Sequence, residues 1–75
     1  MKRHEFIRKI DQYSPIINGY GQRIADIAEV SYTTYQNYKK GFGKDPEVME
    51  RILIACEVVK EEIATHIQQL NSTTT

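Results

Sequence analysis

The chain has 75 residues, a single cysteine, and ten acidic residues against ten basic ones, so its formal net charge is zero. A chain of this length forms one small domain, which buries only about 60% of the surface that its unfolded form exposes. Its apolar content is ordinary and 27% of its residues are charged, which is typical of a globular protein rather than a disordered one.

Membrane and secretory segments are not expected. No apolar run approaches the roughly 18 residues that a membrane span needs. The basic residues at the N-terminus are not followed by the apolar segment of a signal peptide. Because Cys56 is alone, no internal disulfide is possible, and we expect a cytoplasmic protein with no membrane partner.

Charge is unevenly distributed along the chain. Residues 1–44 contain eight basic and four acidic residues, a formal charge of +4, whereas residues 45–75 contain two basic and six acidic ones, a formal charge of −4. Such asymmetry favours a basic half that binds an anionic partner and an acidic half turned away from it. Chance variation of surface charge in a short chain is the alternative explanation.

The first predicted helix covers Arg3–Tyr13, because its apolar residues recur at spacings of three and four. Ser14-Pro15 is predicted to end it, since the residue before a proline is pushed out of the helical region. Asn18–Gly21 contains two glycines and is predicted to be a loop.

Two short helices are predicted next, at about Gln22–Glu29 and Tyr32–Lys40. The first of them places its apolar residues inward (Ile24, Ile27, Ala28). Ser31 is a good N-cap for the second, and Gly41 with Gly43 ends it.

Asp45-Pro46 marks the start of the last helix, because it pairs an N-cap acid with proline at the first helical position. No proline or glycine interrupts the chain from Glu47 to Leu70, so one long helix over about 46–70 is expected, and a kinked or split helix is the alternative. Residues 71–75 are polar and are predicted to be a flexible tail. The expected fold is therefore all-α: a small single-domain bundle of about four helices, residues 1–70, with a long C-terminal helix.

The segment Ile24–Gly41, IADIAEVSYTTYQNYKKG, resembles the helix-turn-helix of phage repressors, Cro proteins and related bacterial regulators, with the motif at about residues 22–40. The resemblance implies that Ala25 lies where the two motif helices cross and that Tyr38 points inward. Glu29 stands at the turn position where the family usually has glycine, because that position often takes a positive φ. Tyr35 stands where Val or Ile is usual; its hydroxyl needs a partner if buried, so either it reaches the surface or the packing differs.

With Tyr35 and Tyr38 inward, a polar face of the second motif helix points outward. Gln and Asn can bond adenine bidentately, and Thr or Tyr can contact a base edge. The predicted base-contacting residues are Tyr32, Thr33, Gln36 and Asn37. The predicted phosphate-contacting residues are Arg23, Lys39, Lys40 and Lys44. An ordinary solvated helix face is the alternative, and the N-terminal basic cluster is either a further phosphate-contacting arm or a solvated helix start (Lys2, Arg3, Arg8, Lys9).

The long C-terminal helix carries more apolar residues than one interface requires. Seven of its residues follow spacings of three and four, the pattern of a coiled-coil seam: Met49, Ile52, Cys56, Val59, Ile63, His66 and Leu70. The part of this seam within residues 48–59 is predicted to pack on the other helices. Ile54 and Val58 lie on roughly the opposite side, so a second neighbour is expected, and a second subunit is the natural candidate. The predicted dimer interface comprises Ile54, Val58, Ile63, His66 and Leu70; His66 is either a pH-sensitive group or a tolerated edge residue.

No constellation for catalysis, cofactor binding or metal binding is apparent. Two distant histidines and one cysteine do not form a zinc site, and the glycines lack a phosphate-loop pattern. The sequence therefore predicts a non-enzymatic, dimeric protein that binds double-stranded DNA, as a small bacterial or phage transcription regulator such as a repressor. The alternative is a helical protein–protein adaptor, antirepressor-like or antitoxin-like, that binds a protein partner through its C-terminal helix.

Overall fold

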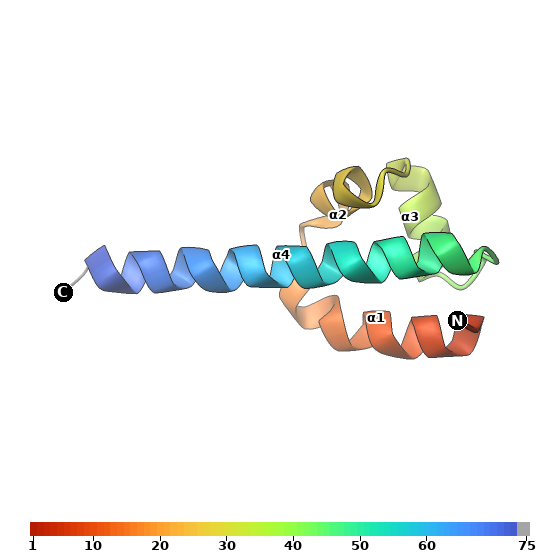
Figure 1. Cartoon of the computed structure of the whole chain (residues 1–75), viewed down its shortest axis with the longest axis horizontal. Helices are drawn as coiled ribbons and strands as arrows, with labels where there is room; N and C mark the ends of the chain where they lie inside the picture. Colours follow the sequence, from red (N-terminus) through yellow and green to blue (C-terminus); the bar gives the residue numbers. More distant parts are fainter. Residues whose placement is uncertain (74–75) are drawn as a thin grey trace.

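The computed structural model contains four helices and no strand in the part of the chain that it describes, residues 1–73 for the backbone and 1–66 for the side chains (Figure 1). The helices are α1 (Arg3–Ile17), α2 (Gly21–Ala28), α3 (Tyr32–Lys39) and α4 (Pro46–Thr73). The all-α bundle with a long C-terminal helix is therefore confirmed.

Helix α4 is the central element of the molecule. Helix α1 packs along one side of it, α2 and α3 lie on the other side, and the C-terminal part of α4 projects beyond all three (Figure 1). Every helix contributes to one core, whose buried side chains are Phe6, Ile10, Ile17, Ile24, Ala25, Ala28, Tyr35, Met49, Ile52, Ala55, Cys56 and Val59. Burying a side chain the size of isoleucine or phenylalanine stabilises the fold by about 1.5–3 kcal/mol, so this core is the main support of so short a chain.

The seam predicted on α4 packs inside the bundle. Met49, Ile52 and Val59 are at most 2% exposed, and Ile63 is partly buried against the same core. The prediction that this seam packs on the other helices over residues 48–59 is confirmed. His66 is exposed, and the side chain of Leu70 lies outside the described residues.

The end of α1 differs from the prediction. The helix does not stop at Ser14-Pro15 but continues through Pro15 to Ile17. Proline removes one backbone hydrogen bond near the end of a helix, where few bonds remain to be lost. Ile17 is only 2% exposed and its carbonyl accepts a bond from the Tyr20 amide (2.9 Å), so core packing and the following turn hold this last helical stretch in place.

The predicted starts of α3 and α4 are confirmed. The Ser31 Oγ accepts a hydrogen bond from the Thr34 amide (3.0 Å), and the Asp45 Oδ1 accepts one from the Glu47 amide (3.0 Å). Such caps satisfy amides that have no partner inside the helix.

The predicted tail at 71–75 begins inside α4, because no helix-breaking residue follows Pro46 and the helix runs to Thr73. The helix thus extends three residues beyond the predicted end at Leu70, and the predicted flexibility of the tail stays a prediction. Residues 74–75 lie outside the described part of the chain.

Candidate nucleic-acid interface

The turn between α2 and α3 depends on a left-handed residue. Glu29 has φ 60° and ψ 42°, and its amide bonds the carbonyl of Asp26 (3.2 Å), while the Val30 amide bonds that of Ala25 (3.0 Å). Non-glycine residues with positive φ are uncommon. The positive φ expected at this position is thus present, although glutamate stands there in place of glycine.

Helix α4 also contacts this turn. The Arg51 Nη2 donates to the Glu29 carbonyl oxygen (3.3 Å) and lies 3.5 Å from the Glu29 carboxylate. The carboxylate is largely exposed, so the ion pair adds little, whereas the bond to the carbonyl ties the turn to α4. Nothing in the local sequence pattern predicts this contact, since it joins positions 22 residues apart.

Helices α2 and α3 approach closely because the residues between them are small. Ala25 is fully buried, as the resemblance implies. Gly21 is the first residue of α2 rather than part of the predicted loop. A Cβ at this position would lie 2.9 Å from Cε1 of Tyr32 and 3.2 Å from Cε2 of Tyr35. Gly21 is therefore a second small residue at the crossing.

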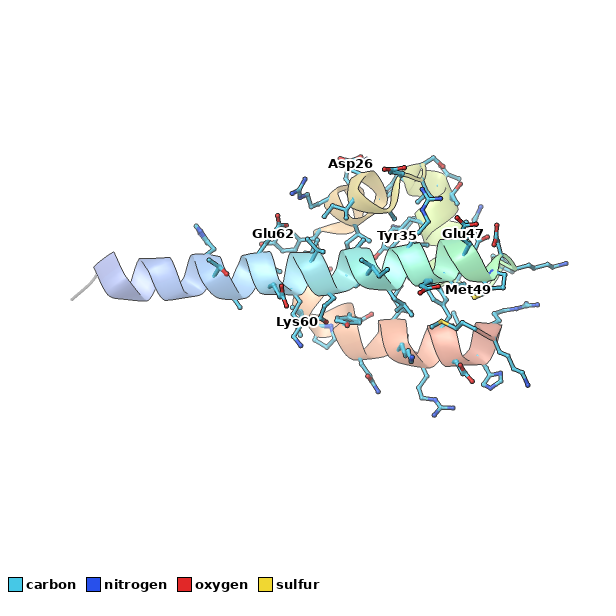
Figure 2. All side chains as sticks on the ribbon, in the orientation of Figure 1. Asp26, Tyr35, Glu47, Met49, Lys60 and Glu62 are labelled. Carbon is cyan, nitrogen blue, oxygen red and sulfur yellow. The ribbon has the colours of Figure 1, made fainter. Side chains whose placement is uncertain are left out.

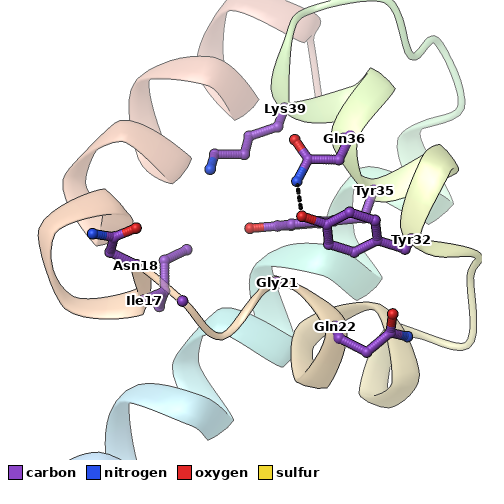
Figure 3. Close-up of a pocket in the computed structure, with 9 residues that line it drawn as sticks. Ile17, Asn18, Gly21, Gln22, Tyr32, Tyr35, Gln36 and Lys39 are labelled. Atoms are coloured by element: carbon purple, nitrogen blue, oxygen red, sulfur yellow. Dashed lines mark hydrogen bonds between the residues drawn. The ribbon is translucent and has the colours of Figure 1, made fainter.

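The two tyrosines predicted to point inward do so. Tyr35 is 1% exposed and lies between α3 and α4 (Figure 2). Tyr38 is partly buried, its ring packs edge-on against Phe6 with 6.3 Å between centroids, and its hydroxyl accepts a bond from the Asp45 amide (3.2 Å). The Tyr35 hydroxyl makes no hydrogen bond to any described residue and opens into a hollow on the surface (Figure 3). Burial raises the pKa of Tyr35 to about 12.

The predicted base-contacting residues share the opposite face of α3. Tyr32 is 45% exposed, Thr33 and Asn37 are exposed, and Gln36 is partly buried. The Gln36 Nε2 donates to the Tyr32 hydroxyl (2.6 Å), so these two side chains form one unit (Figure 3). Because Gln36 Oε1 and the Tyr32 hydroxyl proton remain available, this pair still presents an acceptor and a donor.

The predicted phosphate-contacting cations fall into two groups. Lys39, Lys40 and Lys44 are exposed at the end of α3 and in the loop that follows it, and none forms an ion pair with a described residue. Arg23 instead lies against α4, where its Nη2 is 2.9 Å from Oε2 of Glu62. The hydrogen bond of this pair raises the pKa of Arg23 and lowers the pKa of Glu62. Arg23 is thus engaged within the protein rather than free beside the lysines.

The N-terminal basic cluster is divided by the fold. The Arg3 Nη1 donates to the Gly41 carbonyl oxygen (3.0 Å), which brings the start of α1 to the loop after α3. Lys9 lies elsewhere, along the groove between α1 and α4. Of this cluster, Arg3 joins the lysine-rich end of α3, a placement that only the tertiary fold reveals.

Phe42 is a surface feature that the sequence reasoning missed. It lies in the loop between α3 and α4 and is 70% exposed, although its amide bonds the Asn37 carbonyl (2.9 Å). Its position between Lys40 and Lys44 places an aromatic side chain within the basic loop. In the sequence, the only indication of this exposed side chain is an aromatic residue placed between Gly41 and Gly43.

The face of α4 predicted to have a second neighbour carries exposed apolar side chains. Ile54 is 56% exposed and Val58 is 37% exposed. Ile54 also lines the groove between α1 and α4, together with Leu53, Met1 and Lys9. Of the other predicted dimer-interface residues, Ile63 contacts the core and His66 is exposed.

Within the described residues, no helix is both long and apolar enough to cross a membrane, and no cluster of three His, Cys, Asp or Glu side chains has the geometry to hold a metal ion. Cys56 is buried, which raises the pKa of its thiol to about 11 and keeps it protonated at neutral pH. It therefore behaves as a small core side chain. Comparisons with protein-family models, with curated proteins and with solved structures find no match to this chain.

Proposed function

We propose that this protein is a sequence-specific double-stranded DNA-binding protein that acts as a dimeric, cytoplasmic transcription regulator of the bacterial or phage type. Helix α3 would enter the major groove, while the lysines at its C-terminal end contact phosphates. Regulation would follow from occupancy, because a bound dimer blocks or recruits RNA polymerase. We propose no catalytic step.

The observation that carries this proposal is the arrangement of α2, Glu29 and α3. Two eight-residue helices are joined by a left-handed turn residue, and small residues let them cross closely. The exposed side of α3 is polar rather than apolar, and free lysines follow it. A short polar helix at the surface beside cations has the shape and charge that groove binding requires.

Each side chain of α3 has a role in this proposal. Asn37 is exposed and Gln36 keeps a free carbonyl oxygen, so both suit hydrogen bonding to adenine. Tyr32 and Thr33 lie at the N-terminal end of the helix, where they reach a base edge or a phosphate. Lys39, Lys40 and Lys44 supply affinity without reading the sequence.

Selection of a binding site from a random duplex library tests these roles. On the selected site, Gln36→Ala and Asn37→Ala should each cost about 1–3 kcal/mol and relax the sequence preference, because they remove base contacts. Lys39→Ala and Lys40→Ala should weaken binding to selected and scrambled duplexes equally. Lys60→Ala is the matched control, since this exposed lysine lies on α4 away from α3 (Figure 2). Equal losses on every duplex for all four variants would contradict the assigned roles.

The exposed apolar residues of α4 support a second subunit. Ile54 and Val58 lie one helical turn apart on one face, and a dimer would bury them while placing two α3 helices for two half-sites. Sedimentation should show a dimer for the wild type and a folded monomer for Ile54→Glu.

The same observation favours a second candidate function, a protein–protein adaptor that binds a different protein through Ile54 and Val58. A heteromeric complex that Ile54→Glu abolishes, together with indifference to DNA at low salt, would support the adaptor. Salt-dependent DNA binding supports the regulator.

A further inference from the structure

A hollow of about 320 Å³ lies beside α3, between the α1–α2 loop and the first turn of α2 (Figure 3). Its walls include Asn18 from the loop, Gly21 from α2, and Tyr32, Gln36 and Lys39 from α3. Tyr32, Gln36 and Lys39 lie on the face of α3 that is proposed to contact DNA or at the edge of that face. The hollow therefore belongs to the same side of the molecule.

Tyr35 is the unusual member of this hollow. Its side chain is buried, with 1% exposed, yet the hydroxyl makes no hydrogen bond to a described residue and points into the hollow (Figure 3). The hydroxyl oxygen itself keeps contact with solvent through the hollow, so it is free to donate a hydrogen bond to a group bound there. Because burial raises the pKa of Tyr35 to about 12, the hydroxyl is protonated at neutral pH and is available as a donor.

The start of α2 supplies further donors. The first amides of a helix have no partner within it, and no side chain caps α2. The side chain of Gln22 bonds Asp26 instead (3.0 Å), so it does not cover these amides. Gly21 adds no side chain at the opening. The partial positive charge of a helix start favours an anion in front of it.

The charges around the hollow also favour an anion. Lys39 is the one charged residue among those that line it, and they include no carboxylate. The Lys39 Nζ lies 5.8 Å from the centroid of the Tyr35 ring, so the ammonium group is at the rim (Figure 3). The remaining lining groups are amides, glycines, the Tyr32 hydroxyl and Ile17.

We propose that this hollow binds a phosphate group, with the Tyr35 hydroxyl as the innermost donor, the amides at the start of α2 beside it, and the Lys39 ammonium group closing the rim. The phosphate has two chemical sources, a free phosphate monoester or inorganic phosphate, and a phosphodiester of the DNA backbone. Only the second source rests on the proposed DNA-binding function. A free phosphate would engage Lys39 and the Tyr32–Gln36 pair from the same side as DNA, so it would compete with DNA.

The first arm of the test uses inorganic phosphate and no DNA. Titration into ¹⁵N-labelled protein at constant ionic strength, against sodium chloride as reference, should give saturable shifts of the Gly21 and Gln22 amides. Tyr35→Phe removes only the hydroxyl, which makes no internal bond, and should weaken phosphate binding at least about tenfold. Tyr38→Phe is the matched control on the same helix, because its hydroxyl bonds the Asp45 amide outside the hollow. Lys39→Gln, which leaves the core untouched, serves as a second variant.

The second arm measures duplex DNA binding by the same variants at one salt concentration. Weaker DNA binding in Tyr35→Phe but not in Tyr38→Phe assigns the site to a backbone phosphate, and an effect confined to the first arm assigns it to a free phosphate. Unchanged affinity of Tyr35→Phe in both arms, together with unchanged phosphate affinity of Lys39→Gln, overturns the site. A wild type that binds phosphate but no DNA refutes the proposed function and leaves the hollow as a free-phosphate site.

Discussion

Glu29 holds the connection between α2 and α3 in a conformation that glycine adopts at little cost and other residues do not. The strain is of the order of 1 kcal/mol for an L-residue. Its carbonyl and carboxylate are both near Arg51, so α4 helps to maintain the turn. The turn between the two short helices therefore combines one left-handed residue with one long-range contact to α4.

Replacement of Glu29 tests this conformation. Glu29→Gly should be more stable than Glu29→Ala by about 1 kcal/mol, because both remove the carboxylate and only glycine relieves the positive φ. Urea unfolding at neutral pH measures the difference. An alanine variant as stable as the glycine variant would mean that residue 29 is not left-handed in solution.

At the scale of the elements, some helix ends are set by local sequence signals and others by tertiary packing. Ser31 and Asp45-Pro46 are local signals, and the helices that they begin start where the sequence predicts. The end of α1 is set by tertiary packing, since Ile17 enters the core despite the proline two residues earlier. Local sequence rules describe the first case and miss the second.

The neighbouring pair Ile16 and Ile17 provides a test of that explanation. Ile17→Ala should destabilise the protein by about 2–5 kcal/mol, because it empties a core position, whereas Ile16 is 40% exposed and its replacement should cost well under about 1 kcal/mol. Thermal or urea unfolding compares the two. Similar losses of stability for both variants would contradict the extension of α1 through Pro15.

The candidate interface was predictable only in part, because some of its contacts depend on the tertiary fold rather than on local sequence. Helical spacing separates the outward residues of α3 from Tyr35 and Tyr38, so that division followed from the sequence. The Arg23–Glu62 and Arg3–Gly41 contacts join positions 39 and 38 residues apart, and no local pattern contains them. The hollow in front of Tyr35 likewise depends on three elements that meet only in the folded chain.

At the scale of the whole molecule, two tyrosines couple the fold to alkaline pH. Tyr13 on α1 donates a hydrogen bond to the Glu57 carboxylate on α4 (2.5 Å), and that bond, followed by burial, raises the pKa of Tyr13 to about 12. Burial raises the pKa of Tyr35 to the same value. In its protonated form Tyr13 joins α1 to α4 through this bond, whereas protonated Tyr35 is the form that its buried position favours.

Stability should therefore fall at high pH. A phenol whose pKa is higher in the folded state than its usual value near 10 contributes stability that is complete below pH 10 and disappears as the pH rises toward 12. Urea unfolding from about pH 8 to 11.5 measures this decline, and the double variant Tyr13→Phe/Tyr35→Phe should show a smaller one. An equal decline in the variant would assign the alkaline transition to other groups.

Charge is also organised at this scale. The basic first half of the chain supplies the lysines around α3, and α4 carries half of the acidic residues. Arg3 adds to the basic end through its bond to Gly41, while Arg23 is neutralised by Glu62. The predicted cationic surface is thus narrower than the sequence indicates and is centred on the C-terminal end of α3.

The measurement that tests the central claim most directly is fluorescence anisotropy of labelled random-sequence duplex DNA across a salt series, with wild type, Lys39→Ala/Lys40→Ala and Lys60→Ala side by side. We expect wild-type affinity to fall steeply with salt. The double variant should bind more weakly, with a log–log slope shallower by about 0.9 for each phosphate that it no longer neutralises. Lys60→Ala should follow the wild type. Absence of binding at low salt, or equal weakening in the double variant and in Lys60→Ala, would contradict a DNA-binding face on α3.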